Sequence, residues 1–133
     1  MNQMIVLALV VIIVVAVGIF VTRGRSAGGQ YSDPAELAAL LSSNRTDYVL
    51  VDVRTAEEYS SGHIPGAVNI PYDVIDRNLP TRNKGDLVVL YCRSGNRSGQ
   101  AERTLGGLGY TNLVNFGGVG RWNKDLVRGS QPK

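Results

Sequence analysis

The chain has 133 residues, enough for one small domain but too few for two ordinary ones. Its 14 basic and 11 acidic side chains give a net charge of +3, and no basic run or aromatic-interleaved basic stripe is present, so we expect no nucleic-acid partner. One cysteine and one histidine are too few for a zinc site, and nothing in the sequence indicates another cofactor. A single cysteine also cannot form an internal disulfide, which favours a reducing compartment.

The first feature along the chain is an apolar run over residues 4–21 that contains no charged residue. A helix of these 18 residues would measure about 27 Å, close to the ~30 Å thickness of a bilayer core. No basic residue precedes the run and no A-x-A site ends it, which favours a membrane anchor over a cleaved signal peptide or a buried core helix. Arg23 and Arg25 follow the run, and the positive-inside rule then predicts a single-pass membrane protein with a cytoplasmic domain.

A glycine-rich polar linker over 22–30 separates this predicted bilayer contact from a globular domain over 31–133. The domain holds 12 of the basic and all 11 acidic side chains, so its net charge is only +1. Asp33 and Pro34 provide a helix N-cap and a first-turn proline, and leucines at helical spacing follow them. We therefore expect the domain to open with an amphipathic helix.

Apolar runs and helical segments then alternate along the chain. Continuous apolar runs over 48–52 and 87–91 are typical of buried parallel strands. Shorter strands are predicted over 67–70 and 113–116, and helical segments over 55–61, 73–79, 98–108 and 119–127. This alternation predicts an α/β fold with a mostly parallel sheet flanked by helices, in which ligands bind at the carboxyl ends of the strands.

The candidate nucleophile is Cys92, which follows directly on the second buried run. The residues between this strand and the next helix are Arg93, Ser94, Gly95, Asn96, Arg97 and Ser98. Backbone N–H groups of a tight loop, the positive end of a helix and two guanidinium groups all favour a thiolate, so we expect the pKa of Cys92 to lie below its usual value of about 8.5. The alternative is that Cys92 is a small buried hydrophobic residue with no chemical role.

Several motifs occur in one order and together carry a resemblance. They are Val51–Arg54 with Glu58 and Tyr59, Gly62–Ala67 with Asn69–Pro71, Cys92–Ser98, and Gly117 and Gly118 with Trp122. This order resembles the rhodanese family along nearly the whole globular part. The resemblance implies a five-stranded parallel sheet flanked by helices, and transfer of a sulfane sulfur through a persulfide on Cys92.

The resemblance also implies the site residues and the partners. Cys92 is the expected catalytic residue, the loop from Arg93 to Ser98 is the expected substrate-binding segment, and Asp52 and Arg54 are expected to support it. The donor is an anion such as thiosulfate, or a persulfide, and the acceptor is a thiol or cyanide. An unidentified membrane or sulfur-relay protein is a further candidate partner. In this reading Arg93 and Arg97 bind the anionic donor and stabilise the leaving group.

Other polar residues receive structural interpretations. Asp52 and Arg54 are expected to pair with each other or with Glu58, and so to hold the loops in place. The resemblance places His63 in a turn away from the cysteine loop, and Trp122 is interpreted as a core aromatic residue.

Two other functions stay open at this point. Cysteine phosphatases place five residues between cysteine and arginine, whereas only four lie between Cys92 and Arg97, and a smaller ring fits a sulfur atom better than a phosphate. A non-catalytic binding module is the second alternative, although such modules usually lose the cysteine that this chain keeps.

Overall fold

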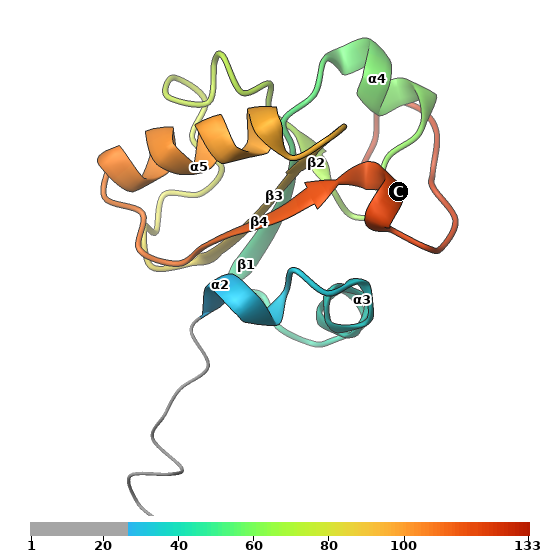
Figure 1. Cartoon of the computed structure of the whole chain (residues 1–133), viewed down its shortest axis with the longest axis horizontal. Coiled ribbons are helices and arrows are strands. Elements are labelled where there is room, and N and C mark those ends of the chain that lie inside the picture. The colour runs from blue at the N-terminus through green and yellow to red at the C-terminus, as the bar shows by residue number, and fades with distance from the viewer. Residues whose placement is uncertain (1–26) are drawn as a thin grey trace, which may run out of the picture.

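The computed structural model describes residues 27–133, and a parallel four-stranded sheet lies at their centre (Figure 1). The strands are β1 (Tyr48–Asp52), β2 (Val68–Asn69), β3 (Leu87–Cys92) and β4 (Leu113–Gly118). Their order is β2-β1-β3-β4, and every neighbouring pair is parallel. All residues of the central strand β3 are buried, which explains why its sequence is a continuous apolar run.

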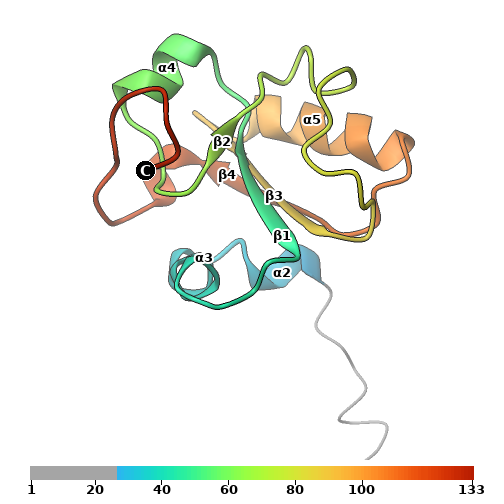
Figure 2. The same ribbon diagram turned by 180° about the vertical axis from the view of Figure 1, so that it is seen from behind.

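Helices cover both faces of the sheet. Figures 1 and 2 show α5 (Asn96–Gly107) on one face and α2 (Ala27–Gln30) with α3 (Pro34–Leu41) on the other. Alternate side chains of β3 therefore enter two separate cores: Val89 and Tyr91 pack with α3, whereas Leu90 and Cys92 pack with α5. The remaining helices are α4 (Ala56–Ser61) and the 3-10 turn η1 (Val119–Arg121). The sheet thus directs Cys92 toward α5.

Two predicted helix starts are confirmed. At α3 the Asp33 carboxylate accepts hydrogen bonds from the N–H groups of Ala35 at 2.8 Å and Glu36 at 3.4 Å. At α4 Thr55 and Glu58 form the reciprocal capping box that their spacing predicts. These caps satisfy first-turn N–H groups, so each helix begins at a defined residue.

Three expectations about the fold are wrong. The helical segment predicted over 73–79 is a series of turns in the structure. The described residues form four strands and not five; each of the four apolar runs gives one strand, and the fifth strand was expected from the resemblance alone. The helix predicted over 119–127 is reduced to η1. Instead, Val127 is extended and exchanges both backbone hydrogen bonds with His63, at 2.9 Å each, so the segment closes over the turn after α4.

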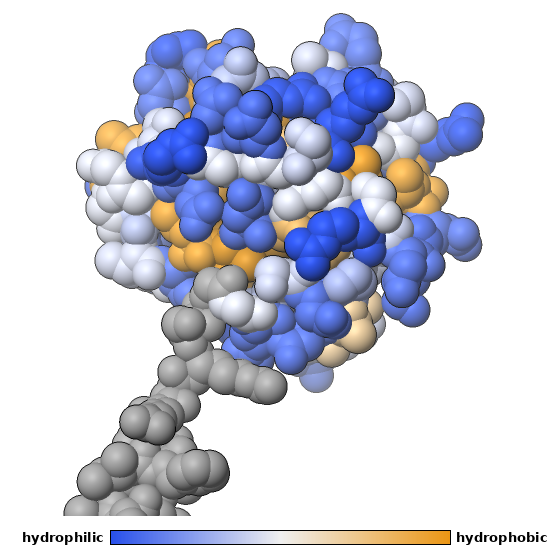
Figure 3. Space-filling view, in the orientation of Figure 1, coloured by the Kyte–Doolittle hydropathy of each residue, from blue (hydrophilic) through white to orange (hydrophobic). Residues whose placement is uncertain are grey.

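The predicted membrane span over 4–21 lies outside the residues that the structure describes. Within 27–133 no helix is long and apolar enough to cross a bilayer. The described part of the chain therefore gives no support to the predicted localisation as a single-pass membrane protein with a cytoplasmic domain, and that localisation is not retained. Figure 3 shows hydrophilic side chains over most of one face of the domain, with an apolar band between α5 and α2.

Candidate functional site

The cysteine loop lies at the carboxyl edge of the sheet, between β3 and α5. Cys92 is the last residue of β3 and its side chain is fully buried. The register pairs Asp52 with Tyr91 and Cys92 with Gly118, so the ends of β1, β3 and β4 meet at this edge. Gly95 has a φ of +97°, a left-handed conformation that turns the chain into α5.

The Cys92 sulfur is surrounded by hydrogen-bond donors from the loop. The Gly95 N–H lies 3.0 Å from Sγ, and the Ser98 hydroxyl oxygen lies 3.4 Å from it. Burial raises the pKa of the thiol, but hydrogen bonds from the Ser98 side chain and from the backbone N–H groups of Ser98, Ser94 and Gly95 together lower it by more. The pKa of Cys92 is therefore below its ordinary value, in the direction that the loop sequence predicts.

Arg97 has a partner that the sequence analysis did not assign to it. Its Nη1 lies 2.7 Å from Oε1 of Glu58 and its Nη2 lies 2.9 Å from Oε2, a two-point ion pair between α5 and α4. Hydrogen bonds from Arg97 lower the pKa of Glu58 to about 2. The charge of Arg97 is thus balanced by a carboxylate beside the cysteine loop.

The other predicted substrate-binding side chains lie at the surface of the loop. Arg93, Ser94 and Asn96 are exposed. The Arg93 guanidinium forms no ion pair or hydrogen bond with any residue in the part of the chain that the structure describes. Because Arg97 is paired, Arg93 carries the uncompensated positive charge of the loop.

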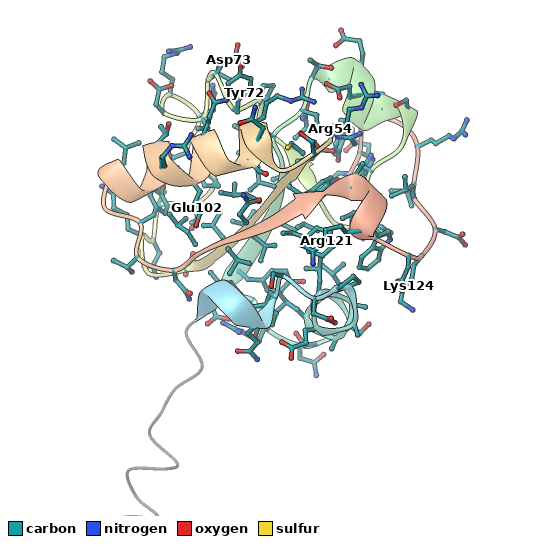
Figure 4. The ribbon with its side chains drawn as sticks, viewed as in Figure 1. Arg54, Tyr72, Asp73, Glu102, Arg121 and Lys124 are labelled. Atoms are coloured by element: carbon teal, nitrogen blue, oxygen red, sulfur yellow. The ribbon has the colours of Figure 1, made fainter. Side chains whose placement is uncertain are left out.

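Asp52 and Arg54 pair with each other, as the sequence predicts. The Arg54 Nε lies 2.9 Å from Oδ1 of Asp52 and its Nη2 lies 2.6 Å from Oδ2, and the side chains of Arg54 and Asp52 are 7% and 0% exposed. The same Nη2 donates to the Gly62 carbonyl at 2.7 Å. This pair therefore ties the end of β1 to the end of α4; Figure 4 shows Arg54 close to α4.

Sequence reasoning missed Asn115, a residue of β4 that forms hydrogen bonds with Ser98, Gly117 and Gly95. Its Oδ1 accepts hydrogen bonds from the Ser98 hydroxyl at 2.7 Å and the Gly117 N–H at 2.9 Å. Its Nδ2 donates to the Gly95 carbonyl at 3.2 Å. A signal was available, because Asn115 is a polar residue inside an apolar strand, and such residues need hydrogen-bond partners when they are enclosed.

Gly117 and Gly118 allow the backbone of β4 to approach the cysteine loop. A Cβ on Gly118 would lie 2.6 Å from the Arg93 carbonyl oxygen, closer than van der Waals contact permits. Gly117 has a φ of +98°, and the register of β4 shifts there relative to β3. The glycine pair noted in the sequence is thus the part of β4 on which the backbone of the cysteine loop packs.

His63 lies away from the cysteine loop, as expected. Its ring is buried and stacks on Tyr59, with centroids 3.7 Å apart, and its Nδ1 lies 2.9 Å from the Tyr59 carbonyl oxygen. These contacts fix the turn after α4. We assign it no chemical role.

Comparison with known families identifies the chain. The profile of the rhodanese-like domain matches residues 33–125. The chain belongs to the rhodanese-like domain family, and the parallel sheet flanked by helices is the fold of that family.

Three similar proteins illustrate the relationship. Thiosulfate sulfurtransferase PspE from Escherichia coli K12 is 41% identical over 71 residues, which cover 52% of this chain and 68% of PspE. A solved structure described as a rhodanese with anions from E. coli has a TM-score of 0.54 and 37% identity, and covers 62% of this chain and 99% of its own. The adenylyltransferase and sulfurtransferase UBA4 from Candida albicans is 34% identical over 92 residues, 62% of this chain but only 21% of UBA4. The named relatives place sulfur transfer at the level of the family.

Proposed function

We propose that this protein is a sulfurtransferase that carries a sulfane sulfur on Cys92. The donor is thiosulfate or a persulfide, and the acceptor is a thiol or cyanide. The observation that carries the proposal is the environment of the Cys92 sulfur, which lies at a strand end against the Gly95 N–H at 3.0 Å and has a lowered thiol pKa. The name of the relative PspE, a thiosulfate sulfurtransferase, supports the choice of donor.

The chemistry consists of two displacements at sulfur. The Cys92 thiolate attacks the outer sulfur of thiosulfate, a new S–S bond forms, the S–S bond of thiosulfate breaks, and sulfite leaves with the electron pair. The thiolate or cyanide acceptor then attacks the outer sulfur of the persulfide, and Cys92 leaves as a thiolate. A preformed thiolate needs no separate general base in either step.

The loop residues divide this work. Backbone N–H groups of Ser94, Gly95 and Ser98 stabilise negative charge on the Cys92 sulfur in the thiolate and in the second displacement. Arg93 attracts the anionic donor, since its guanidinium is exposed and unpaired among the described residues. Asn96 and Arg97 are the remaining polar side chains at the entrance of the loop. Arg97 is held in place there by its ion pair with Glu58.

The supporting residues hold the loop rather than contact the donor. The Asp52–Arg54 pair joins the end of β1 to the Gly62 carbonyl at the end of α4, and so fixes these two ends relative to each other. We propose residues 31–133 as the catalytic domain and 22–30 as the linker before it, of which the last four residues form α2 against the sheet. A sulfur-relay protein is the proposed macromolecular partner, because the relatives include the sulfurtransferase UBA4, of which this chain matches only one part.

Mass spectrometry of the full chain after incubation with thiosulfate tests this function. The expected result is a gain of one sulfur atom on Cys92, its absence in Cys92→Ser, and its loss when cyanide or a thiol is added. Thiocyanate or a new persulfide should appear in equal amount. A Cys92 that stays unmodified with thiosulfate and with small persulfide donors would contradict the proposal and favour a non-catalytic module.

A further inference from the structure

The Ser98 hydroxyl has two acceptors and only one hydrogen. Its oxygen lies 2.7 Å from Asn115 Oδ1 and 3.4 Å from Cys92 Sγ. A hydroxyl group can donate one hydrogen bond at a time, while its lone pairs accept others. The two short contacts therefore describe a choice: Ser98 donates either to the amide oxygen or to the sulfur.

The orientation of the Asn115 amide fixes which acceptor Ser98 faces on β4. Oδ1 accepts from the Gly117 N–H at 2.9 Å, and Nδ2 donates to the Gly95 carbonyl at 3.2 Å. Turning the amide over would place two donors face to face at Gly117 and two acceptors face to face at Gly95. Ser98 therefore meets an amide oxygen, and it donates its hydrogen there when Cys92 is a neutral thiol.

Ionisation of Cys92 reverses the choice. A hydrogen bond to a charged acceptor is stronger than one to a neutral amide, so Ser98 turns its hydrogen to the thiolate. That turn breaks the bond to Asn115 Oδ1. Ser98 thus stabilises the thiolate only by the difference between the two hydrogen bonds, and Asn115 determines the size of that difference.

We propose that Asn115 is a positioning residue of the cysteine site, which holds the Ser98 hydroxyl hydrogen and the Gly95 carbonyl and thereby sets how readily the Cys92 sulfur loses its proton. This inference rests on the proposed function of Cys92 as the sulfur carrier. Asn115 forms no hydrogen bond with the sulfur among the described residues, and it acts through Ser98 and the loop backbone.

None of the charged or titratable side chains near the sulfur forms a hydrogen bond with Asn115, whose partners are the Ser98 hydroxyl, the Gly117 N–H and the Gly95 carbonyl. These side chains are Arg97 on α5 with Glu58 on α4, Asp52 at the end of β1 with Arg54, Arg93 in the loop, and Tyr72, which packs against the same core as Cys92. Strand β4 contributes no titratable side chain, because its sequence is Leu-Val-Asn-Phe-Gly-Gly. A change at Asn115 to a neutral residue therefore leaves this set of charges intact.

A double-mutant cycle on the full chain tests the inference. The readout is the thiol pKa of Cys92, taken from the pH dependence of its alkylation by iodoacetamide, and Cys92 is the one cysteine of the chain. In the wild-type background Ser98→Ala should raise this pKa only slightly. In the Asn115→Ala background the same Ser98→Ala change should raise it by about 0.5 to 1 unit more, since the hydroxyl then has no competing acceptor.

Two further variants separate this role from a structural one. Asn115→Asp keeps an acceptor for Ser98 and strengthens it, so Ser98→Ala should then shift the pKa less than in the wild type. This variant also serves if Asn115→Ala fails to fold. Asn69→Ala is the matched control, because Asn69 also binds backbone carbonyls, those of Asp52 and Arg54, but does not contact Ser98. It should show no coupling to Ser98.

The outcomes are distinct. Equal shifts from Ser98→Ala in the wild-type and in the Asn115 backgrounds overturn the inference. The alkylation assay contains no sulfur donor, so it reports on Asn115 whether or not the protein transfers sulfur. If Asn115 and Ser98 are coupled but the protein takes no sulfur from any donor, the proposed function is refuted and the inference about Asn115 still holds.

Discussion

Arg97 and Glu58 form a two-point ion pair that joins α5 to α4 beside the cysteine loop, with N–O distances of 2.7 Å and 2.9 Å. Glu58 performs a second task, because it also closes the capping box with Thr55 at the start of α4. The Glu58 carboxylate therefore fixes both the position of Arg97 in the first turn of α5 and the first turn of α4. The pair connects the stability of the domain to the geometry of its candidate site.

The Glu58–Arg97 pair predicts an acid-dependent loss of stability. The pKa of Glu58 is about 2 in the folded protein, below its unfolded value near 4.5, so the pair stabilises the fold above about pH 4.5 and this contribution is lost as the pH falls toward 2. Because both side chains are about one-quarter to one-third exposed, we expect only about 1 kcal/mol. Urea unfolding at pH 7 and pH 3 should show this loss in the wild type and a smaller one in Glu58→Gln. An equal loss in both proteins would contradict the assignment.

The buried Asp52–Arg54 pair predicts a larger effect on stability. Arg54→Ala leaves the fully buried Asp52 carboxylate without its partner, and breaking such a pair costs about 3–5 kcal/mol. Replacing both residues, as in Asp52→Leu with Arg54→Met, removes both charges and should cost clearly less than Arg54→Ala alone. Denaturant unfolding of the three proteins makes the comparison. A single variant within about 1 kcal/mol of the wild type would show that the pair does not hold the loops.

Most of the fold follows from local patterns in the sequence. Apolar runs mark all four strands, and Asp33, Thr55 and Gly109 mark helix ends, because strand burial and helix capping are local properties of the chain. The helix expected over 119–127 fails for a non-local reason. The backbone of Val127 pairs with His63, a residue far away in the sequence, and no spacing rule reports such a pairing.

The contacts of the candidate site also divide into those close in sequence, which were predicted, and those distant in sequence, which were not. Cys92 and its loop are readable because strand, loop and helix are contiguous, and the Asp52–Arg54 pair joins residues two positions apart. The partners of Arg97 and Ser98 come from α4 and β4, at sequence separations of 39 and 17 residues. Without the register of the sheet, Glu58 and Asn115 could not be placed beside the cysteine loop.

The close approach of β4 to the loop predicts a sharp difference between two glycines. A Cβ on Gly118 would lie 2.6 Å from the Arg93 carbonyl oxygen, whereas a Cβ on Gly120 meets no atom within 4 Å. Gly118→Ala should displace the loop, lower stability by about 1–3 kcal/mol and reduce sulfur transfer at least about tenfold. Gly120→Ala, the matched control, should change neither. Thiosulfate-dependent sulfur loading, measured beside unfolding, checks both, and equal behaviour of the two variants would contradict the packing argument.

The lowered pKa of Cys92 predicts the pH dependence of the first sulfur-transfer step. The thiolate is the reacting form, so the loading rate should rise with pH through the thiol pKa and become constant above it. That midpoint should lie below the thiol pKa of an ordinary cysteine. Single-turnover loading with excess thiosulfate gives the profile, because thiosulfate stays a dianion across this range. Alkylation of Cys92 in the same buffers should give the same midpoint, since both reactions use the thiolate. A midpoint above that of an ordinary cysteine in both assays would mean that burial of the thiol outweighs the hydrogen bonds from Ser94, Gly95 and Ser98, and that the loop does not activate the sulfur.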